Sequence, residues 1–154
     1  MDLFTPVTTK DRHHPNFTQT LAPSASPVRE ILSAWAEGFV DRDGKFVHEF
    51  QTTYNSAFWE LYLFAVLKDL GIQVDLIYSS PDFVCVDPAL VIEAAIASHA
   101  QDDTPEWRKD MRTVIRSDTD AANRQTIIRL SNAFLEKARR YTPFMPVSEN
   151  PWAR

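Results

Sequence analysis

The chain has 154 residues, of which 44% are hydrophobic and 12% aromatic, and its formal net charge is −5 at pH 7. This length and composition support one small domain with a single core. No apolar run approaches the roughly 18 residues of a membrane span, and the single cysteine, Cys85, excludes an internal disulfide. We therefore expect a cytoplasmic protein with no membrane partner, and the acidic balance argues against nucleic-acid binding over the whole surface.

The first 27 residues contain several prolines and serines and show no apolar periodicity. This composition predicts a flexible arm over residues 1–27, and no apolar segment after a basic start indicates a signal peptide. The predicted domain covers residues 28–141. Three prolines follow Tyr141, so we expect residues 142–154 to form an irregular tail that adds no more than a short edge strand at Phe144–Val147.

The segment Ala57–Leu67 is apolar on all sides except at Glu60, which predicts a buried helix that ends before Gly71. Glu60 shares a helix face with Phe64 and Leu67. Its carboxylate would then lie in an apolar environment, where it must be paired or neutralised. The alternative is a first-turn glutamate that the helix dipole stabilises.

A strand is expected at Ile72–Tyr78, and a β-hairpin follows it. The two arms of the hairpin are apolar runs rich in β-branched residues, Phe83–Val86 and Leu90–Ala94. Asp87-Pro88 lies between them and is typical of a turn. Cys85, inside the first arm, is expected to be a small buried hydrophobe rather than a nucleophile.

Two carboxylates meet at the open end of this predicted hairpin. When the chain folds about Asp87-Pro88, Asp82 faces Glu93, with cross-strand Cβ atoms about 5 Å apart. Two ionised carboxylates at that separation repel, so the site should raise one pKa, find a basic partner or bind a metal ion through oxygen. Two alternatives stay open. A slip of one residue would send the two side chains to opposite faces, and exposed strand ends would leave both in solvent.

Basic residues concentrate late in the chain, with 10 basic and 6 acidic residues from Pro105 onward against 6 and 15 before it. A helix over about residues 121–141 is expected to bury Ile127, Leu130, Phe134 and Ala138. Its basic side chains are candidates for phosphate contacts, chiefly Arg124, Arg129 and Lys137. The alternative is an ordinary solvated face that complements the helix dipole.

Three motifs follow one another along the chain: Glu60 in AFWELYLFAVL, Pro81-Asp82 in SPDFV and Glu93 in VIEAA. This order resembles the PD-(D/E)XK nuclease superfamily, whose core is a helix carrying Glu and then a hairpin carrying Pro-Asp and Glu-x-Lys. The resemblance covers roughly Phe46–Ala95. It implies an α/β (α+β) fold with a small mixed β-sheet and flanking helices, an αβββα restriction-endonuclease-like core that is shortened at its C-terminal strand.

The same resemblance implies a chemistry. Asp82 and Glu93 would ligate Mg²⁺ or Mn²⁺, and Glu60 would hold a metal-bound water or a second ion. Such ions polarise the scissile phosphate and generate hydroxide for in-line attack on nucleic acid. The expected function is therefore a metal-dependent nuclease with Glu60, Asp82 and Glu93 as catalytic residues.

One position departs from the family pattern. Two residues after Glu93, the family has a lysine that orients water and stabilises negative charge. This chain has Ala95 at that position, and alanine cannot play that role. Lys68, Gln51 or a residue of the later basic helix could replace the lysine, and Gln51 joins the candidate nucleic-acid contacts. Two further functions stay open: a catalytically inactive module that binds nucleic acid or protein, and a structural subunit whose three carboxylates pair with arginines. A shortened family member also exposes a sheet edge, which predicts homodimerisation or a partner protein.

Overall fold

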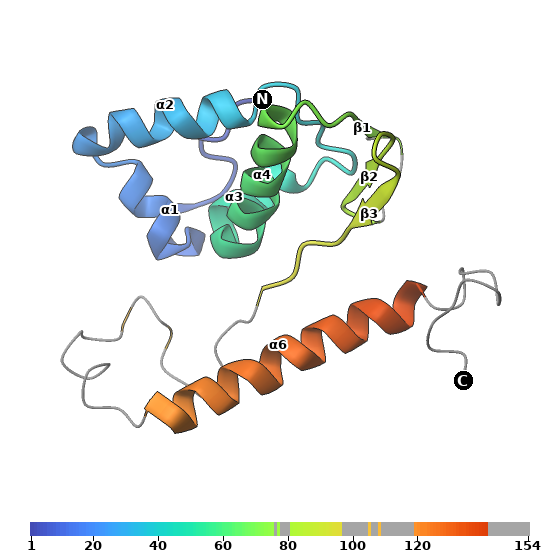
Figure 1. The fold of residues 1–154 in the computed structure, drawn as a ribbon. Coiled ribbons are helices and arrows are strands. Elements are labelled where there is room, and N and C mark those ends of the chain that lie inside the picture. Colours follow the sequence, from blue (N-terminus) through green and yellow to red (C-terminus); the bar gives the residue numbers. More distant parts are fainter. Residues whose placement is uncertain (76, 78–80, 97–104, 106–107, 109–118, 142–154) are drawn as a thin grey trace, which may run out of the picture. The chain divides into compact units, whose positions relative to one another are not determined.

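The computed structural model describes residues 1–75, 77, 81–96, 105, 108 and 119–141, which Figure 1 draws in colour. The chain divides into two compact units, Met1–Ala94 and Ala95–Arg154. The domain predicted over residues 28–141 thus spans parts of both units, and the N-terminal segment belongs to unit 1. The predicted tail, residues 142–154, lies outside the described residues.

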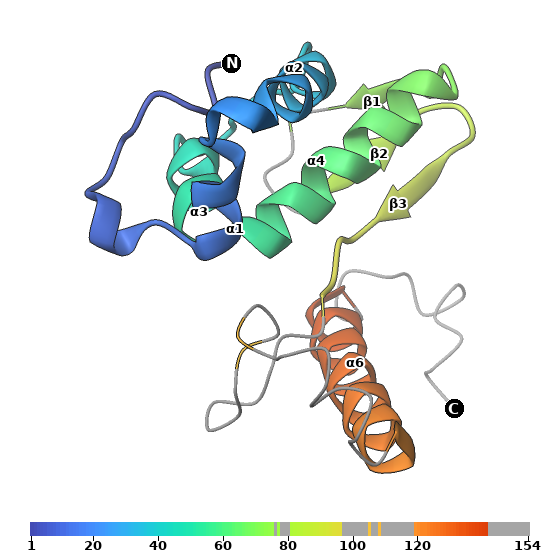
Figure 2. The same cartoon turned by 90° about the vertical axis from the view of Figure 1, so that its left-hand side faces the viewer.

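Unit 1 is mostly helical, and a small sheet follows its last helix. Its helical elements are η1 (Lys10–Arg12), α1 (Pro15–Thr20), η2 (Pro23–Ala25), α2 (Ser26–Trp35), α3 (Phe46–Thr52) and α4 (Tyr54–Asp69). Its strands are β1 (Val74–Asp75), β2 (Phe83–Cys85) and β3 (Leu90–Ile92). Figure 2 shows α4 crossing the sheet, and Leu61 and Leu67 of α4 share one core with Phe83 and Cys85 of β2.

Helix α4 forms where the apolar run predicts it. Its end is a Schellman motif, in which Gly71 has a φ of +69° and donates its N–H to the carbonyl oxygen of Lys68 at 3.0 Å. The N–H of Ile72 donates to the carbonyl oxygen of Leu67 at 2.9 Å. Because α4 begins at Tyr54, Glu60 lies beyond its first turn, and the dipole-stabilised alternative does not apply.

The sheet is an antiparallel meander in the order β1-β2-β3. Phe83 pairs with Ile92 and Val84 with Val91, which confirms the register predicted from the Asp87-Pro88 turn. The expected mixed sheet is wrong for the described strands, because short connections join consecutive strands and leave no crossover. Alternation sends Phe83 into the core at 0% exposure and leaves Val91 62% exposed.

The predicted flexible arm over residues 1–27 is wrong, because this segment folds onto the helices. Leu3 is 1% exposed and Phe17 0% exposed, and both belong to the core. Pro15 and Pro23 stand at the first turns of α1 and η2, where a missing N–H removes no helical hydrogen bond. The proline content therefore marks helix starts here rather than disorder.

Gln51 fastens this N-terminal segment to α3. It is fully buried, and its Nε2 donates to the carbonyl oxygens of Leu3 at 3.2 Å and Thr5 at 2.9 Å. Its Oε1 accepts the N–H of Val7 at 3.0 Å. These contacts place Gln51 inside the protein, so we remove it from the candidate nucleic-acid contacts and from the replacements for the absent lysine.

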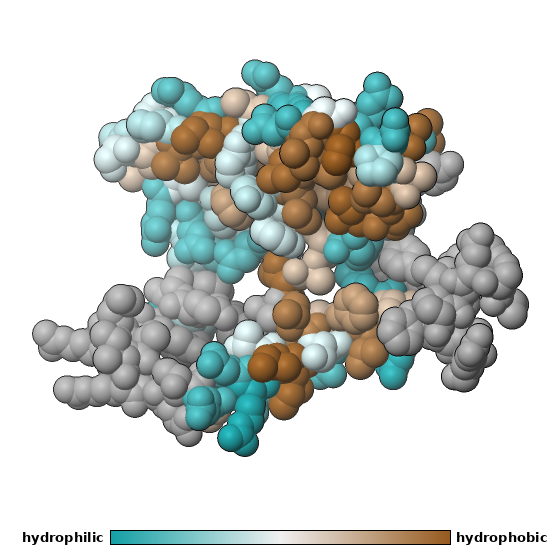
Figure 3. All heavy atoms as spheres, viewed as in Figure 1, coloured by the Kyte–Doolittle hydropathy of each residue, from teal (hydrophilic) through white to brown (hydrophobic). Residues whose placement is uncertain are grey.

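Unit 2 contributes helix α6 (Thr119–Tyr141), close to the range predicted from sequence. The burial predicted for its apolar side chains is wrong: Ile127 is 62%, Leu130 49% and Phe134 61% exposed, and apolar spheres lie on its surface in Figure 3. Periodicity identifies the face that can be buried but not what covers it. Among the described residues, no helix is both long and apolar enough to cross a membrane.

We predict that Gln51→Leu lowers the free energy of unfolding by about 2–3 kcal/mol, because a similar apolar volume leaves the buried backbone partners of the amide unpaired. Urea denaturation followed by tryptophan fluorescence measures the change. Gln19→Leu is the matched control, since Gln19 is exposed on α1. Equal midpoints for Gln51→Leu and the wild type would mean that other contacts hold the N-terminal segment.

Candidate functional site

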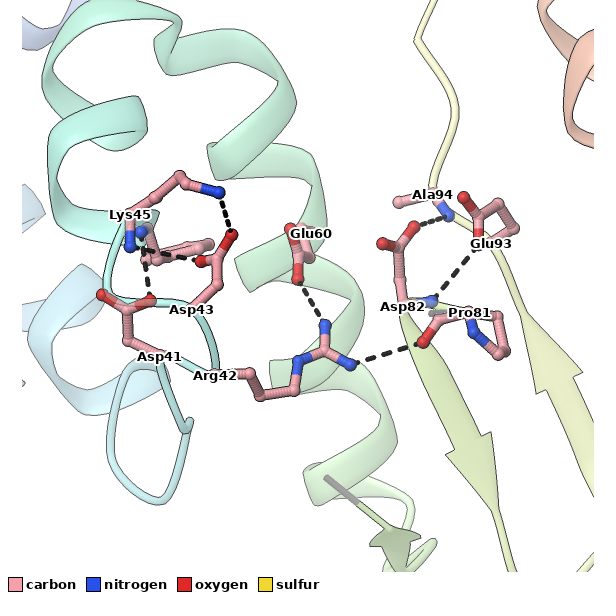
Figure 4. A network of polar contacts seen from close by, with 10 residues as sticks. Asp41, Arg42, Asp43, Lys45, Glu60, Pro81, Asp82, Glu93 and Ala94 are labelled. Atoms are coloured by element: carbon pink, nitrogen blue, oxygen red, sulfur yellow. Dashed lines mark hydrogen bonds and ion pairs between the residues drawn. The ribbon is translucent and has the colours of Figure 1, made fainter. Parts of the chain in front are cut away.

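A polar hollow opens in unit 1 where the loop between α2 and α3 meets α4 and the start of β2. Its volume is about 170 Å³. Five carboxylates and one guanidinium line it, together with three apolar residues: Asp41, Asp43, Glu49, Glu60, Asp82 and Arg42, with Phe39, Val40 and Phe46. Figure 4 shows Arg42 reaching between Glu60 and the segment that leads into β2.

The loop that carries Arg42 is held by its own aspartates. Asp41 Oδ1 accepts the N–H of Phe46, the first residue of α3, at 3.1 Å. Asp43 accepts the N–H of Lys45 at 3.2 Å and the Nζ of the same lysine at 2.9 Å. Phe46 is buried, so these bonds tie the loop to the core and direct Arg42 into the hollow.

Arg42 links two elements through one guanidinium. Its Nη2 lies 3.4 Å from Glu60 Oε1 on α4, and its Nη1 donates to the carbonyl oxygen of Pro81 at 3.3 Å. The side chains of Arg42 and Glu60 are 14% and 20% exposed. Arg42 is not among the site residues predicted from the sequence, because Asp41-Arg42-Asp43-Gly44 is typical of a turn and nothing near it in the sequence indicates a partner for the arginine.

The Glu60 carboxyl is the group whose pKa the site changes most clearly. This pKa is raised from 4.5 to about 7, and burial is the largest cause. The charge of Asp82 contributes to the rise, and Arg42 acts in the opposite direction. Glu49 and Glu93 add to the rise. Carboxylates from α3 and from both arms of the hairpin therefore act on the Glu60 side chain of α4.

Asp82 and Glu93 lie side by side, as the register predicts. The N–H of Asp82 donates to Glu93 Oε2 at 3.2 Å, and the N–H of Ala94 donates to Asp82 Oδ2 at 2.6 Å. Each carboxylate thus accepts a backbone N–H from the opposite arm of the hairpin, next to the last pair of the β2–β3 ladder, Phe83 and Ile92 (Figure 4). Backbone donors stabilise the ionised form of a carboxylate and so offset part of the repulsion between the two.

The donor set suits a hard cation. Carboxylate oxygens are the ligands that Mg²⁺ and Mn²⁺ prefer, and Mg²⁺ is commonly held by one or two protein carboxylates with water and substrate phosphate. Asp82 and Glu93 supply such a pair. Within the described residues no group of three His, Cys, Asp or Glu side chains is arranged as a complete metal centre. Glu60 therefore does not complete a three-ligand site with Asp82 and Glu93.

Two of the predicted replacements for the absent lysine, Gln51 and Lys68, are engaged in other contacts, and the residues of the later basic helix stay a prediction. Lys68 donates its Nζ to the carbonyl oxygens of Ala34 at 2.9 Å and Glu37 at 3.0 Å, which caps the end of α2. Arg124, Arg129 and Lys137 belong to unit 2. Cys85 is 3% exposed and its burial raises the thiol pKa, so its predicted role as a buried hydrophobe is confirmed.

Comparisons with protein families, curated proteins and solved structures find no match to this chain. The function of the hollow must therefore be inferred from the chemistry of its own residues.

We predict that Glu60→Gln stabilises the protein at pH 8 by about 1–2 kcal/mol and changes little at pH 4.5. The folded-state pKa of Glu60 is raised, so the folded state binds the proton more tightly, and wild-type stability falls as pH rises from 4.5 to 7. Glutamine stays neutral and avoids this loss. The full shift corresponds to about 3 kcal/mol, and partial exposure reduces it.

Urea unfolding at several pH values measures the difference. Glu49→Gln is the control, since Glu49 lines the same hollow but is exposed. A stability difference between Glu60→Gln and the wild type that does not change with pH would contradict the assignment of a raised pKa to Glu60.

Proposed function

We propose that this protein is a metal-dependent phosphodiesterase that acts on nucleic acid. One observation carries the proposal: carboxylates from separate elements converge, with Glu60 on α4 and the hydrogen-bonded pair Asp82 and Glu93 at the open end of the hairpin. Like charges are brought together in this way at sites that bind cations or transfer protons. The chain order α4-β1-β2-β3-α6 supports an αβββα restriction-endonuclease-like core.

Each carboxylate has a separate role in this proposal. Asp82 and Glu93 hold Mg²⁺ or Mn²⁺, which when bound would polarise the phosphate and acidify water. Glu60 positions the attacking water in the hollow. The water oxygen bonds to phosphorus, one ester P–O bond breaks, and the leaving oxygen takes up a proton, which yields a phosphomonoester end and a hydroxyl end.

We predict that purified protein cleaves labelled DNA or RNA, single- or double-stranded, in the presence of Mg²⁺ or Mn²⁺. Asp82→Asn and Glu93→Gln should each lower the rate at least about 100-fold, because each removes a cation ligand and keeps the side-chain volume. Titration calorimetry with Mn²⁺ should show the same variants losing a binding site. Asp69→Asn is the control, since Asp69 is exposed at the end of α4 and outside the hollow.

Cleavage that persists in both Asp82→Asn and Glu93→Gln would point to a contaminating nuclease. A wild type that neither cuts any of the four substrates nor binds Mn²⁺ would overturn the enzymatic proposal and favour the second candidate.

The second candidate is a catalytically inactive module that binds nucleic acid or a protein partner. Ala95 stands where the nuclease family has its lysine, and it carries no positive charge. Arg42 carries a positive charge but is paired with Glu60. The sheet exposes Val86 at 59% and Val91 at 62%, beside the edge strand β3. An apolar sheet face with an open edge is a common site of pairing with another chain, so homodimerisation stays a prediction of this candidate.

Helix α6 is the candidate nucleic-acid contact in both proposals. Lys137 lies eight residues after Arg129, which puts the two roughly 80° apart around the helix, whereas Arg124 lies roughly 140° from Arg129. Arg129 and Lys137 therefore form the closer pair, and Arg124 projects from another side.

We predict that Arg129→Gln/Lys137→Gln weakens binding of a labelled single-stranded oligonucleotide about tenfold at low salt. Loss of two phosphate contacts should also lower the slope of log affinity against log salt by about 1.4. Fluorescence anisotropy at four salt concentrations measures both quantities. Arg139→Gln is the control, because Arg139 lies on the same helix and is 3.7 Å from Glu136. An unchanged affinity and slope in the double variant would leave these residues as an ordinary solvated face.

A further inference from the structure

Arg42 is the cationic residue among the described residues that line the hollow. The other charged lining residues are carboxylates, and Lys45 of the same loop is turned to the outside, where it pairs with Asp43 and is 67% exposed. A negatively charged ligand that enters the hollow therefore meets repulsion from every charged lining residue except Arg42. Arg42 is therefore the lining residue that would attract such a ligand.

The contacts that Arg42 makes with Glu60 and Pro81 are long. They measure 3.4 Å and 3.3 Å, against about 2.7–2.9 Å for a typical charge-assisted hydrogen bond and 2.9 Å for the Lys45–Asp43 pair. Guanidinium is also weakly hydrated and planar, and its parallel N–H groups match two oxygens of one phosphate. A phosphate can therefore compete with the Glu60 carboxylate and the Pro81 carbonyl oxygen for the guanidinium.

Phosphodiester hydrolysis places further demands on this residue. Negative charge builds up on the phosphate oxygens as water attacks, and a pre-positioned cation in a water-poor site stabilises that charge. Arg42 is 14% exposed and reaches the hollow between α4 and β2, on the side where Asp82 begins the second strand. A phosphate next to Asp82 would lie within reach of the same guanidinium.

We infer that Arg42 binds the phosphodiester group of the substrate, exchanging its contact with Glu60 for two phosphate oxygens. This inference rests on the proposed function for the identity of the ligand, and it assigns the hollow an anionic substrate in spite of its acidic lining. Glu60 is released to the attacking water by the same exchange.

The test measures binding separately from cleavage. Anisotropy of a labelled oligonucleotide is recorded in Ca²⁺ and without metal for wild type, Arg42→Gln, Arg42→Lys and the control Lys45→Gln. We expect Arg42→Gln to weaken oligonucleotide binding about tenfold. Arg42→Lys keeps the positive charge and should weaken binding only about threefold. Lys45→Gln should bind as the wild type does. Mn²⁺ calorimetry should show that Arg42→Gln binds metal at least as tightly as the wild type, because a competing cation has been removed. Urea unfolding of each variant verifies that it is folded.

The outcomes separate the two proposals. Unchanged oligonucleotide binding in Arg42→Gln would overturn the inference and leave Arg42 as the counter-ion of Glu60. Loss of binding in that variant, with a wild type that neither cuts nucleic acid nor binds Mn²⁺, would support the inference and overturn the enzymatic function. A wild type that binds no oligonucleotide would overturn both.

Discussion

The register of the β2–β3 hairpin fixes the core and the candidate site together. Because side chains alternate between the faces of a sheet, the pairing that sends Phe83 beneath α4 also brings Asp82 beside Glu93. A slip of one residue would expose Phe83 and separate the carboxylates. Burial of a phenylalanine side chain is worth about 2–3 kcal/mol, which is comparable with the roughly 1–4 kcal/mol that a pair of like charges about 4 Å apart costs near a protein surface. Core packing therefore maintains an arrangement that electrostatics alone would disfavour.

The fold offsets the repulsion around the hollow in two ways. Asp82 and Glu93 each accept a backbone N–H from the neighbouring strand, so the sheet itself supplies partial positive charge. Arg42 adds a full charge from a loop that Asp41 ties to α3. Because these donors belong to the backbone and to a fastened loop, the fold itself holds the acidic cluster in place.

Local signals in the sequence were enough to predict the elements that carry the site. Gly71 marks the end of α4, and Asp87-Pro88 marks the tip of the hairpin. Both signals affect only the backbone of residues close to them in the sequence. From the turn the register followed, and from the register the neighbours Asp82 and Glu93.

Contacts between distant parts of the chain were not predictable in the same way. Gln51 holds Leu3 across 48 residues, and nothing near Leu3 distinguishes its segment from a disordered arm. Arg42 meets Glu60 across 18 residues from within a sequence typical of a turn. The exposure of Ile127 on α6 depends on what packs against the helix, which periodicity does not report.

The balance of charges at Glu60 is of the kind found at functional sites. A counter-ion that fully compensated for burial would hold the pKa of Glu60 at or below its ordinary value. The pKa is instead raised to about 7, so at neutral pH the pair leaves part of the desolvation cost of Glu60 unrecovered. A neutral side chain of similar size would give a more stable fold. Groups that lower stability in this way are concentrated at functional sites, where a strained or charged arrangement serves binding or catalysis. Glu60 supports a functional assignment for this reason, and Asp82 and Glu93 share it because their charges contribute to the same cost.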